Sequence, residues 1–145
     1  MNKVLAIDPG IAKSGLVIAD IRHKQVIQAL VIKSTYLVTF VKKIYQEEDI
    51  INFLIGNGTS SQKYVEILKE FIPNMIVAEE KHSTYRAKQR FFEIFPLKGI
   101  KKFLPREIFT LNKNLDALAA LIILEDFYSC KFKMNKSIST KTWLK

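Results

Sequence analysis

The sequence predicts an α/β fold: a five-stranded sheet of mixed direction, with its first three strands antiparallel and helices on its faces. Three apolar runs separated by short polar turns open the chain, and two units that each pair a helical pattern with an apolar run follow them. A length of 145 residues fits one domain, and a content of 48% apolar residues supplies a hydrophobic core.

The first three strands are expected at 4–7, 15–19 and 25–32. Turn residues at 8–10 (Asp-Pro-Gly) end the first strand, and the polar segment 20–24 separates the second strand from the third. Because a parallel crossover needs a dozen or more residues, connections this short predict an antiparallel meander.

Two helix–strand units follow the meander. Apolar residues recur at helical spacing over 37–45, behind Ser34 as a candidate cap, and 51–55 is the fourth strand. Thr59 and Gln62 have the spacing of a capping box and open the next helix. Strands linked through helices are expected to join in parallel. The inner face of the second helix is expected at Tyr64, Ile67, Leu68 and Phe71, and the fifth strand at 75–78.

The rest of the chain predicts two more helices and a tail. Ser83 or Thr84 caps the first of these helices, and the second covers 115–128. Residues 131–145 hold five lysines and no acid, so we expect a domain at 1–130 and a loosely ordered basic tail with Trp143 as its bulky anchor. The inner face of the helix that Ser83 or Thr84 caps is expected at Ala87, Phe91, Ile94 and Phe95.

The charge of the chain favours a polyanionic partner. Lys and Arg total 23 against 14 Asp and Glu, which gives a net charge of +9, so nucleic acid is the first expectation and an acidic membrane surface the second. The single cysteine, Cys130, excludes an internal disulfide and a cysteine-rich zinc site. Because the apolar run at 4–7 is too short for a signal peptide and none is long enough to cross a bilayer, we expect a cytoplasmic protein.

Acidic residues interrupt apolar surroundings at three places. Asp8 ends the first strand, Glu79 and Glu80 follow the fifth, and Asp116 lies in the first turn of the last helix. Functional groups gather at the carboxyl ends of strands, and converging carboxylates bind Mg²⁺ or Mn²⁺, so the pattern indicates metal-assisted phosphodiester hydrolysis. Plainer interpretations remain: a turn at Asp8, a helix-dipole contact at Asp116, and solvated carboxylates at 79 and 80, of which at most one points into a site.

Basic residues gather between positions 81 and 106, where there are eight against the single acid Glu93. Arg86 and Arg90 are four apart and are expected to share the outer face of their helix. Since the signs are not mixed in this stretch, we expect a phosphate-binding strip beside the acidic end of the fifth strand.

Three segments resemble a known family in the same order and at full-domain spacing. Val-Leu-Ala-Ile-Asp-Pro-Gly at 4–10, with Lys13 and Gly15, resembles the first-strand motif of RuvC-like nucleases with the ribonuclease H fold. Residues 77–84 resemble the Asp-Glu-Arg-x-Ser/Thr-Ser/Thr segment of the YqgF (RuvX) branch, and 115–124 resemble its terminal helix. The resemblance covers about residues 3–128.

The chain departs from the family pattern at three positions. Glu79 stands where the family has Asp, and Lys81 stands where it has Arg, which keeps the charge but loses bidentate phosphate geometry. Asn57 stands where RuvC has a carboxylate near the end of its fourth strand, so the YqgF branch is favoured over the resolvases.

The resemblance implies a sheet order of 3-2-1-4-5 and two Mg²⁺ or Mn²⁺ ions on Asp8, Glu80 and Asp116. It also implies nuclease action on structured nucleic acid, in maturation of precursor 16S ribosomal RNA first, with cutting of Holliday junctions as the alternative. A catalytically silent binding module with the same fold is a further alternative, and RNA or DNA, monomer or homodimer, and Glu79 or Glu80 as the ligand stay open. The residues expected to contact nucleic acid are Lys13, Lys81, Arg86, Arg90, Lys98, Lys101 and Lys102.

Overall fold

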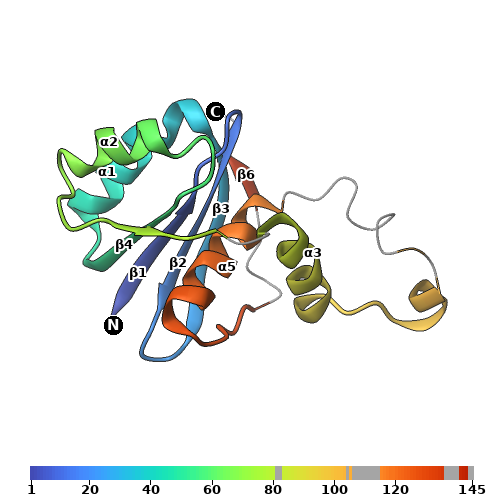
Figure 1. The fold of residues 1–145 in the computed structure, drawn as a ribbon. Helices are drawn as coiled ribbons and strands as arrows, with labels where there is room; N and C mark the ends of the chain where they lie inside the picture. The colour runs from blue at the N-terminus through green and yellow to red at the C-terminus, as the bar shows by residue number, and fades with distance from the viewer. Residues whose placement is uncertain (81–82, 104, 106–114, 136–140, 144–145) are drawn as a thin grey trace.

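A mixed sheet runs through the centre of the protein in the order β5-β4-β1-β2-β3-β6 (Figure 1). The structure is a computed structural model that describes residues 1–80, 83–103, 105, 115–135 and 141–143. Neighbouring pairs among the first three strands are antiparallel, whereas β4 joins β1, and β5 joins β4, in parallel. The strands are β1 (Lys3–Asp8), β2 (Lys13–Asp20), β3 (Gln25–Lys33), β4 (Ile50–Gly56), β5 (Ile76–Ala78) and β6 (Lys141–Trp143).

The predicted α/β class, the antiparallel meander and the order 3-2-1-4-5 are confirmed. The short strand β6 was not predicted; it pairs in parallel with β3 and becomes an edge of the sheet. Its three residues come from the segment that the sequence assigned to a loosely ordered tail.

Helices cover both faces of the sheet (Figure 1). The helices α1 and α2 pack on one face, and α3 and α5 pack on the other. The short helix η2 lies at the end of an arm that leaves the sheet beyond α3. The helices are η1 (Ser34–Tyr36), α1 (Leu37–Glu47), α2 (Gln62–Lys69), α3 (Ser83–Ile94), η2 (Gly99–Phe103) and α5 (Asp116–Tyr128).

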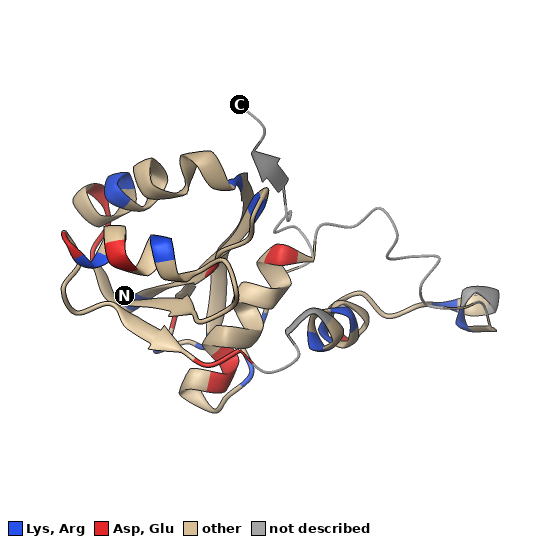
Figure 2. Ribbon diagram, turned by 45° about the horizontal axis from the view of Figure 1, so that its top comes forward, with Lys and Arg blue, Asp and Glu red and all other residues tan. Residues whose placement is uncertain are grey.

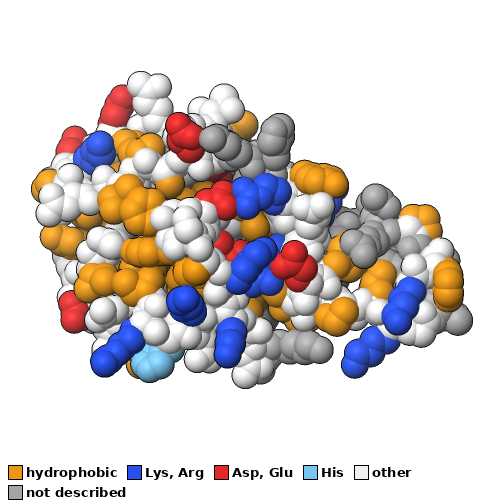
Figure 3. Space-filling view, turned by 60° about the horizontal axis from the view of Figure 1, so that its bottom comes forward, with side chains coloured by type: hydrophobic (Ala, Val, Ile, Leu, Met, Phe, Trp, Pro, Cys, Tyr) orange, Lys and Arg blue, Asp and Glu red, His pale blue; other side chains and the backbone are white. Residues whose placement is uncertain are grey.

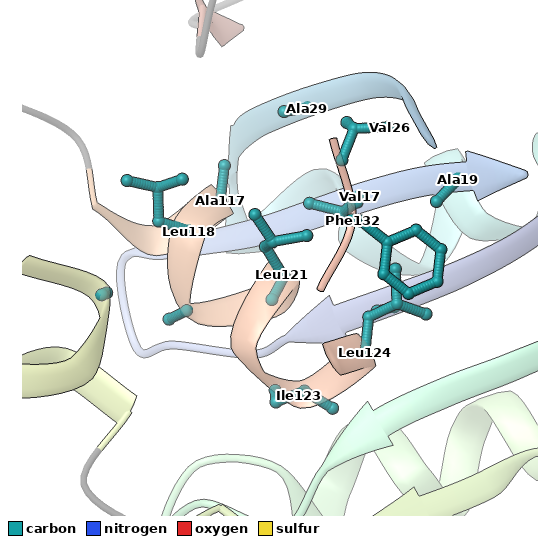
Figure 4. Close-up of a cluster of buried hydrophobic side chains, with 14 of the residues drawn as sticks. Val17, Ala19, Val26, Ala29, Ala117, Leu118, Leu121, Ile123, Leu124 and Phe132 are labelled. Atoms are coloured by element: carbon teal, nitrogen blue, oxygen red, sulfur yellow. The ribbon is translucent and has the colours of Figure 1, made fainter. Parts of the chain in front are cut away.

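Alternation along the strands divides the core into two layers. Leu5 and Ile7 of β1 face α1 and α2, whereas Val4 and Ala6 face α5, as the two-residue period of a strand requires. Side chains of β2 and β3 meet those of α5 on the second face (Figure 4). Both faces of the sheet are therefore closed to water along β1.

The helix α5 is buried along most of its length. Nine consecutive residues, 117–125, are buried, because the helix packs between the sheet and α3. Among the described residues, no helix combines the length and the apolar character that crossing a membrane requires. The apolar run in α5 is thus accounted for by core packing.

Two predicted helix caps are wrong. The Ser34 hydroxyl does not cap a helix; it donates to the carbonyl of Gly10, 2.7 Å away. The helix α2 begins at Gln62 without a side-chain cap, so the predicted capping box at Thr59 is absent. Ile67, which was expected on its inner face, is 41% exposed. Local spacing misassigned Ser34 because its hydroxyl bonds to groups that lie 20 or more residues away in the sequence.

The predicted solvent-facing position of Arg90 is also wrong. Arg90 is 9% exposed, and its guanidinium donates to both carboxylate oxygens of Glu125, to Glu93 and to the carbonyl of Phe132. Arg86 donates twice to Asp126 at 2.6 Å. The partners on α5 lie 35 and 40 residues further along the chain, so charge counting within 81–106 missed them.

The basic strip expected on α3 is therefore partly an interface with α5. On the face drawn in Figure 3, Lys and Arg side chains stand next to Asp and Glu side chains. Bidentate pairs between a guanidinium and a carboxylate fix the distance between two helices as well as their charge balance. The arginines of α3 hold α3 against α5.

The segment after α5 belongs to the core, contrary to the expectation of a loose tail from residue 131. Phe132 is 1% exposed and packs with α5 and β3 (Figure 4). Lys133 joins the turn between β2 and β3: its carbonyl accepts from the Val26 N–H, and its N–H donates to the Lys24 carbonyl, both at 2.8 Å. The side chain of Trp143, the expected anchor, lies outside the described part.

Replacing Phe132 with Ala is expected to destabilise the protein by about 3–5 kcal/mol, because a fully buried aromatic side chain leaves a cavity. Urea unfolding followed by circular dichroism measures the loss. Phe103→Ala, which removes a side chain that is 88% exposed, is the control and should change stability by less than about 0.5 kcal/mol. Equal unfolding midpoints for the two variants would show that Phe132 is not part of the core.

Candidate carboxylate site at the ends of β1 and β5

The site is centred on Asp8, the last residue of β1, with a glycine on each neighbouring strand. Asp8 pairs with Gly15 of β2. On the other side Ile7 pairs with Ile55, so Gly56 at the end of β4 is the next residue in register. The absence of two side chains leaves space on both sides of the Asp8 carboxyl group.

The start of α5 fills the space at Gly15. A Cβ atom added to Gly15 would overlap the backbone carbonyl of Asp116 and would lie 2.7 Å from the Ala117 nitrogen. The first turn of α5 therefore sits directly on β2. This contact brings Asp116 to the strand that neighbours Asp8.

The Glu80 carboxylate fills the space at Gly56. A Cβ on Gly56 would overlap Glu80 Oε1, and one on Gly58 would lie 2.8 Å from Oε2. The backbone N–H of Glu80 donates to the side-chain oxygen of Asn57 at 2.9 Å, and the Asn57 N–H donates to the Ala78 carbonyl at 3.0 Å. Asn57, which the family comparison singled out as a departure, joins the ends of β4 and β5 here.

The three carboxyl groups influence one another. The pKa of Asp8 is raised to about 8. Burial is the largest cause, followed by a hydrogen bond with Glu80 and by repulsion from Glu80 and Asp116. Burial also raises the pKa of Asp116, while the ammonium group of Lys13 opposes that shift. Asp8 thus keeps its proton to a higher pH than a solvated aspartate would.

The structure brings four of the predicted site residues together: Asp8, Glu80, Asp116 and Lys13. Between the two adjacent glutamates, Glu80 lies at Asp8, whereas Glu79 is exposed and lines a separate hollow beside α5.

The other predicted basic residues lie away from the carboxylates or outside the description. Lys98 and Lys102 are exposed on the arm that ends in η2 (Figures 1 and 2). Lys81 lies outside the described residues, as does the side chain of Lys101. Arg86 and Arg90 hold α5, as shown above. Among the predicted phosphate contacts that the structure describes, the charge of Lys13 acts on the Asp116 carboxylate.

The donor set fits a hard divalent cation, although the three carboxylates are not gathered into one ligand group. Glu80 Oε1 is buried and has no hydrogen-bond partner, and a carboxylate pair that resists double ionisation is stabilised by a cation. Within the described ranges, no three His, Cys, Asp or Glu side chains form a group that could hold a metal ion. A shared ion would be held by Asp8 and Glu80, and the Asp116 side chain would have to approach them.

Two buried serines that the sequence analysis missed support the loop after Asp8. Ser14 and Ser34 lie 2.7 Å apart through their hydroxyl oxygens, and both reach Gly10: its N–H donates to Ser14 Oγ, and its carbonyl accepts from Ser34 Oγ. Both side chains are buried among apolar strand residues. The sequence does contain a signal: Ser14 directly precedes the second predicted strand, and Ser34 lies two residues after the third.

Asp8→Asn is expected to stabilise the protein at alkaline pH. The folded-state pKa of Asp8 is about 8 against an ordinary 3.8, so the folded protein binds more protons between these values, and its stability falls as pH rises through them. Asn has no charge to bury, so the melting temperature of the variant should exceed that of the wild type by several degrees at pH 8–9 and converge with it near pH 4.

Thermal unfolding across that pH range measures this effect. Asp49→Asn, at an exposed position before β4, is the matched control and should run parallel to the wild type. A melting temperature of Asp8→Asn at or below that of the wild type at pH 8 would contradict the buried position of the Asp8 carboxyl group.

The two glycines are expected to respond differently to substitution by Ala. Gly15→Ala meets backbone atoms of α5, which cannot move without the helix, so the loss of stability should be roughly 2 kcal/mol or more. Gly56→Ala meets mainly the end of the Glu80 side chain, which can rotate, so its loss should be smaller. Chemical denaturation compares them, and a greater loss for Gly56→Ala would contradict the close approach of α5 to β2.

Comparison with known proteins does not assign the chain. It matches no family model, and no curated protein matches it.

Proposed function

We propose that the chain is a metal-dependent nuclease with a ribonuclease H-like fold, of the YqgF branch of RuvC-like proteins, that cleaves structured nucleic acid. The observation that supports the proposal is the buried Asp8 carboxyl group at the end of β1, with Glu80 beside it and with Asp116 near enough to raise its pKa. The sheet order and the excess of basic residues are consistent with it. Precursor 16S ribosomal RNA is the proposed substrate, and branched DNA is the alternative.

Four residues have distinct parts in the proposed reaction. Asp8 and Glu80 would hold the cation, and Asp116 would contribute from the start of α5. When bound, Mg²⁺ or Mn²⁺ supplies positive charge that activates water and stabilises the leaving oxygen. Lys13, whose charge already acts on Asp116, orients a backbone phosphate without reading its sequence.

A catalytically silent binding module is the second candidate. It is favoured by the position of Asp116, which interacts with Asp8 at a distance and is not part of a three-ligand group among the residues described. The two candidates differ in one respect: the nuclease needs a bound divalent cation, whereas the binding module does not.

Asp8→Asn, Glu80→Gln and Asp116→Asn are each expected to lower cleavage by about a hundredfold or more, because each removes a charge that would hold the cation. The assay offers precursor ribosomal RNA fragments and four-way DNA junctions in parallel with Mn²⁺. Glu79→Gln is the matched control, since Glu79 is adjacent to Glu80 and faces away from Asp8, and it should cleave at close to the wild-type rate.

Thermal stabilisation by Mn²⁺ separates the candidates. The nuclease predicts an increase in melting temperature that Asp8→Asn abolishes. Binding of nucleic acid with neither cleavage nor stabilisation by Mn²⁺ would replace the nuclease with the binding module. Full cleavage by Asp8→Asn would eliminate the proposed site.

A further inference from the structure

A hollow of about 270 Å³ lies beside the carboxylates, between the loop after β1 and the loop after β4. The first loop begins at Asp8, and the second contains Gly58, which lies against the Glu80 carboxylate. Each of the two loops that enclose the hollow thus also contributes to the candidate site. The residues that line it are Ile11, Thr59, Ser60, Gln62 and Lys63.

Buried hydrogen bonds fix both walls of the hollow. In the first wall, Ser14 and Ser34 hold both polar backbone groups of Gly10, and the Ser34 N–H donates to the Ala12 carbonyl at 3.0 Å. In the second wall, the Ser61 hydroxyl donates to the Gly58 carbonyl at 2.6 Å.

A further bond joins the two walls, because the Tyr64 hydroxyl of α2 donates to the Ser34 carbonyl at 3.3 Å. The shape of the hollow is thus set before any ligand arrives, which lowers the entropic cost of binding.

The lining suits an anionic, partly apolar ligand. Ile11 is 87% exposed on the first wall, and the second wall carries two hydroxyl groups and the ammonium of Lys63, which lies 4.8 Å from the centroid of the Tyr64 ring. No carboxylate is among the described residues that line the hollow. Gln62 contacts an acid outside the lining: its amide donates to Glu66 at 3.3 Å.

The larger hollow beside α5, of about 670 Å³, has the opposite electrostatic character. Three of its lining residues are the acids Glu79, Glu125 and Asp126. Its cations are paired, Arg86 with Asp126 and Lys131 with Glu93. A phosphate there would displace an existing ion pair and face like charge, so the smaller hollow is the better anion site despite its size.

We propose that the smaller hollow binds one nucleotide of the substrate strand, next to the scissile phosphate. Its sugar packs on Ile11, and its phosphate lies between the ammonium of Lys63 and the hydroxyls of Thr59 and Ser60. The volume suits one nucleotide unit and is too small for a duplex. This inference rests on the proposed nuclease function and identifies where the strand is held.

The test uses the full chain with the variants Ile11→Ala and Lys63→Gln. KM and kcat are measured with Asp8 intact, and the Kd of a fluorescent substrate is measured in the Asp8→Asn background, which binds without cleaving. We expect KM and Kd to rise about three- to tenfold for each variant while kcat stays within about twofold of the wild type, since the contacts lie outside the reacting atoms. Lys63→Gln should also reduce the slope of log Kd against log salt by about one.

Two matched controls lie on α2 outside the hollow. Ile67→Ala removes an exposed isoleucine, and Lys69→Gln removes an exposed lysine, so both should leave KM, Kd and the salt slope unchanged.

The possible outcomes distinguish the two claims. Normal cleavage with unchanged KM and Kd in both hollow variants would overturn the nucleotide site and leave the nuclease standing. Weaker binding by the hollow variants in a protein that never cleaves would support the nucleotide site and overturn the nuclease. Equal effects of Lys63→Gln and Lys69→Gln would overturn the nucleotide site, because the loss would then reflect net charge.

Discussion

The first turn of α5 packs directly on Gly15 of β2, and this contact fixes the position of the helix against which α3 and Phe132 pack. Only a residue without a side chain lets the backbone of α5 approach the sheet at this point. Small residues of the helix, such as Ala117 and Ala120, and of the strands, such as Ala19 and Ala29, are buried in the same layer. The position of α5 in turn determines where α3 docks, since Arg86 and Arg90 bind acids of α5, and where Phe132 is buried.

The same packing brings together groups that repel one another. Gly15 admits the start of α5 on one side of Asp8, and Gly56 admits the Glu80 carboxylate on the other, so Glu80 lies beside Asp8 while the charge of Asp116 acts on Asp8 from further away. The raised pKa of Asp8 expresses the cost of that arrangement at neutral pH. Burial of a carboxyl group beside other carboxylates costs stability, and such groups are more frequent at functional sites than in ordinary cores.

The sequence predicted the features that depend on local pattern and missed those that depend on distant partners. Apolar runs and short turns were sufficient to locate the strands β1 to β5, and the family resemblance supplied their order. The acids at the ends of the first and fifth strands indicated that Asp8 and Glu80 lie close together. The strand β6 is three residues long, too short for a periodic signal. Arg90 was misplaced because its partner Glu125 lies on another helix, where a window over α3 alone does not reach.

The charge of the protein has to be considered at two ranges. A net charge of +9 acts at long range and attracts a polyanion whether or not individual cations are paired. At contact range, a guanidinium that is already bound to a carboxylate offers little to a phosphate, and Arg86 and Arg90 are in that state. A basic segment in the sequence is therefore a poor guide to the place where a strand would be held. In the proposed function that place is decided by a few residues around the smaller hollow, where Lys63 offers an ammonium group to a lining that contains no acid.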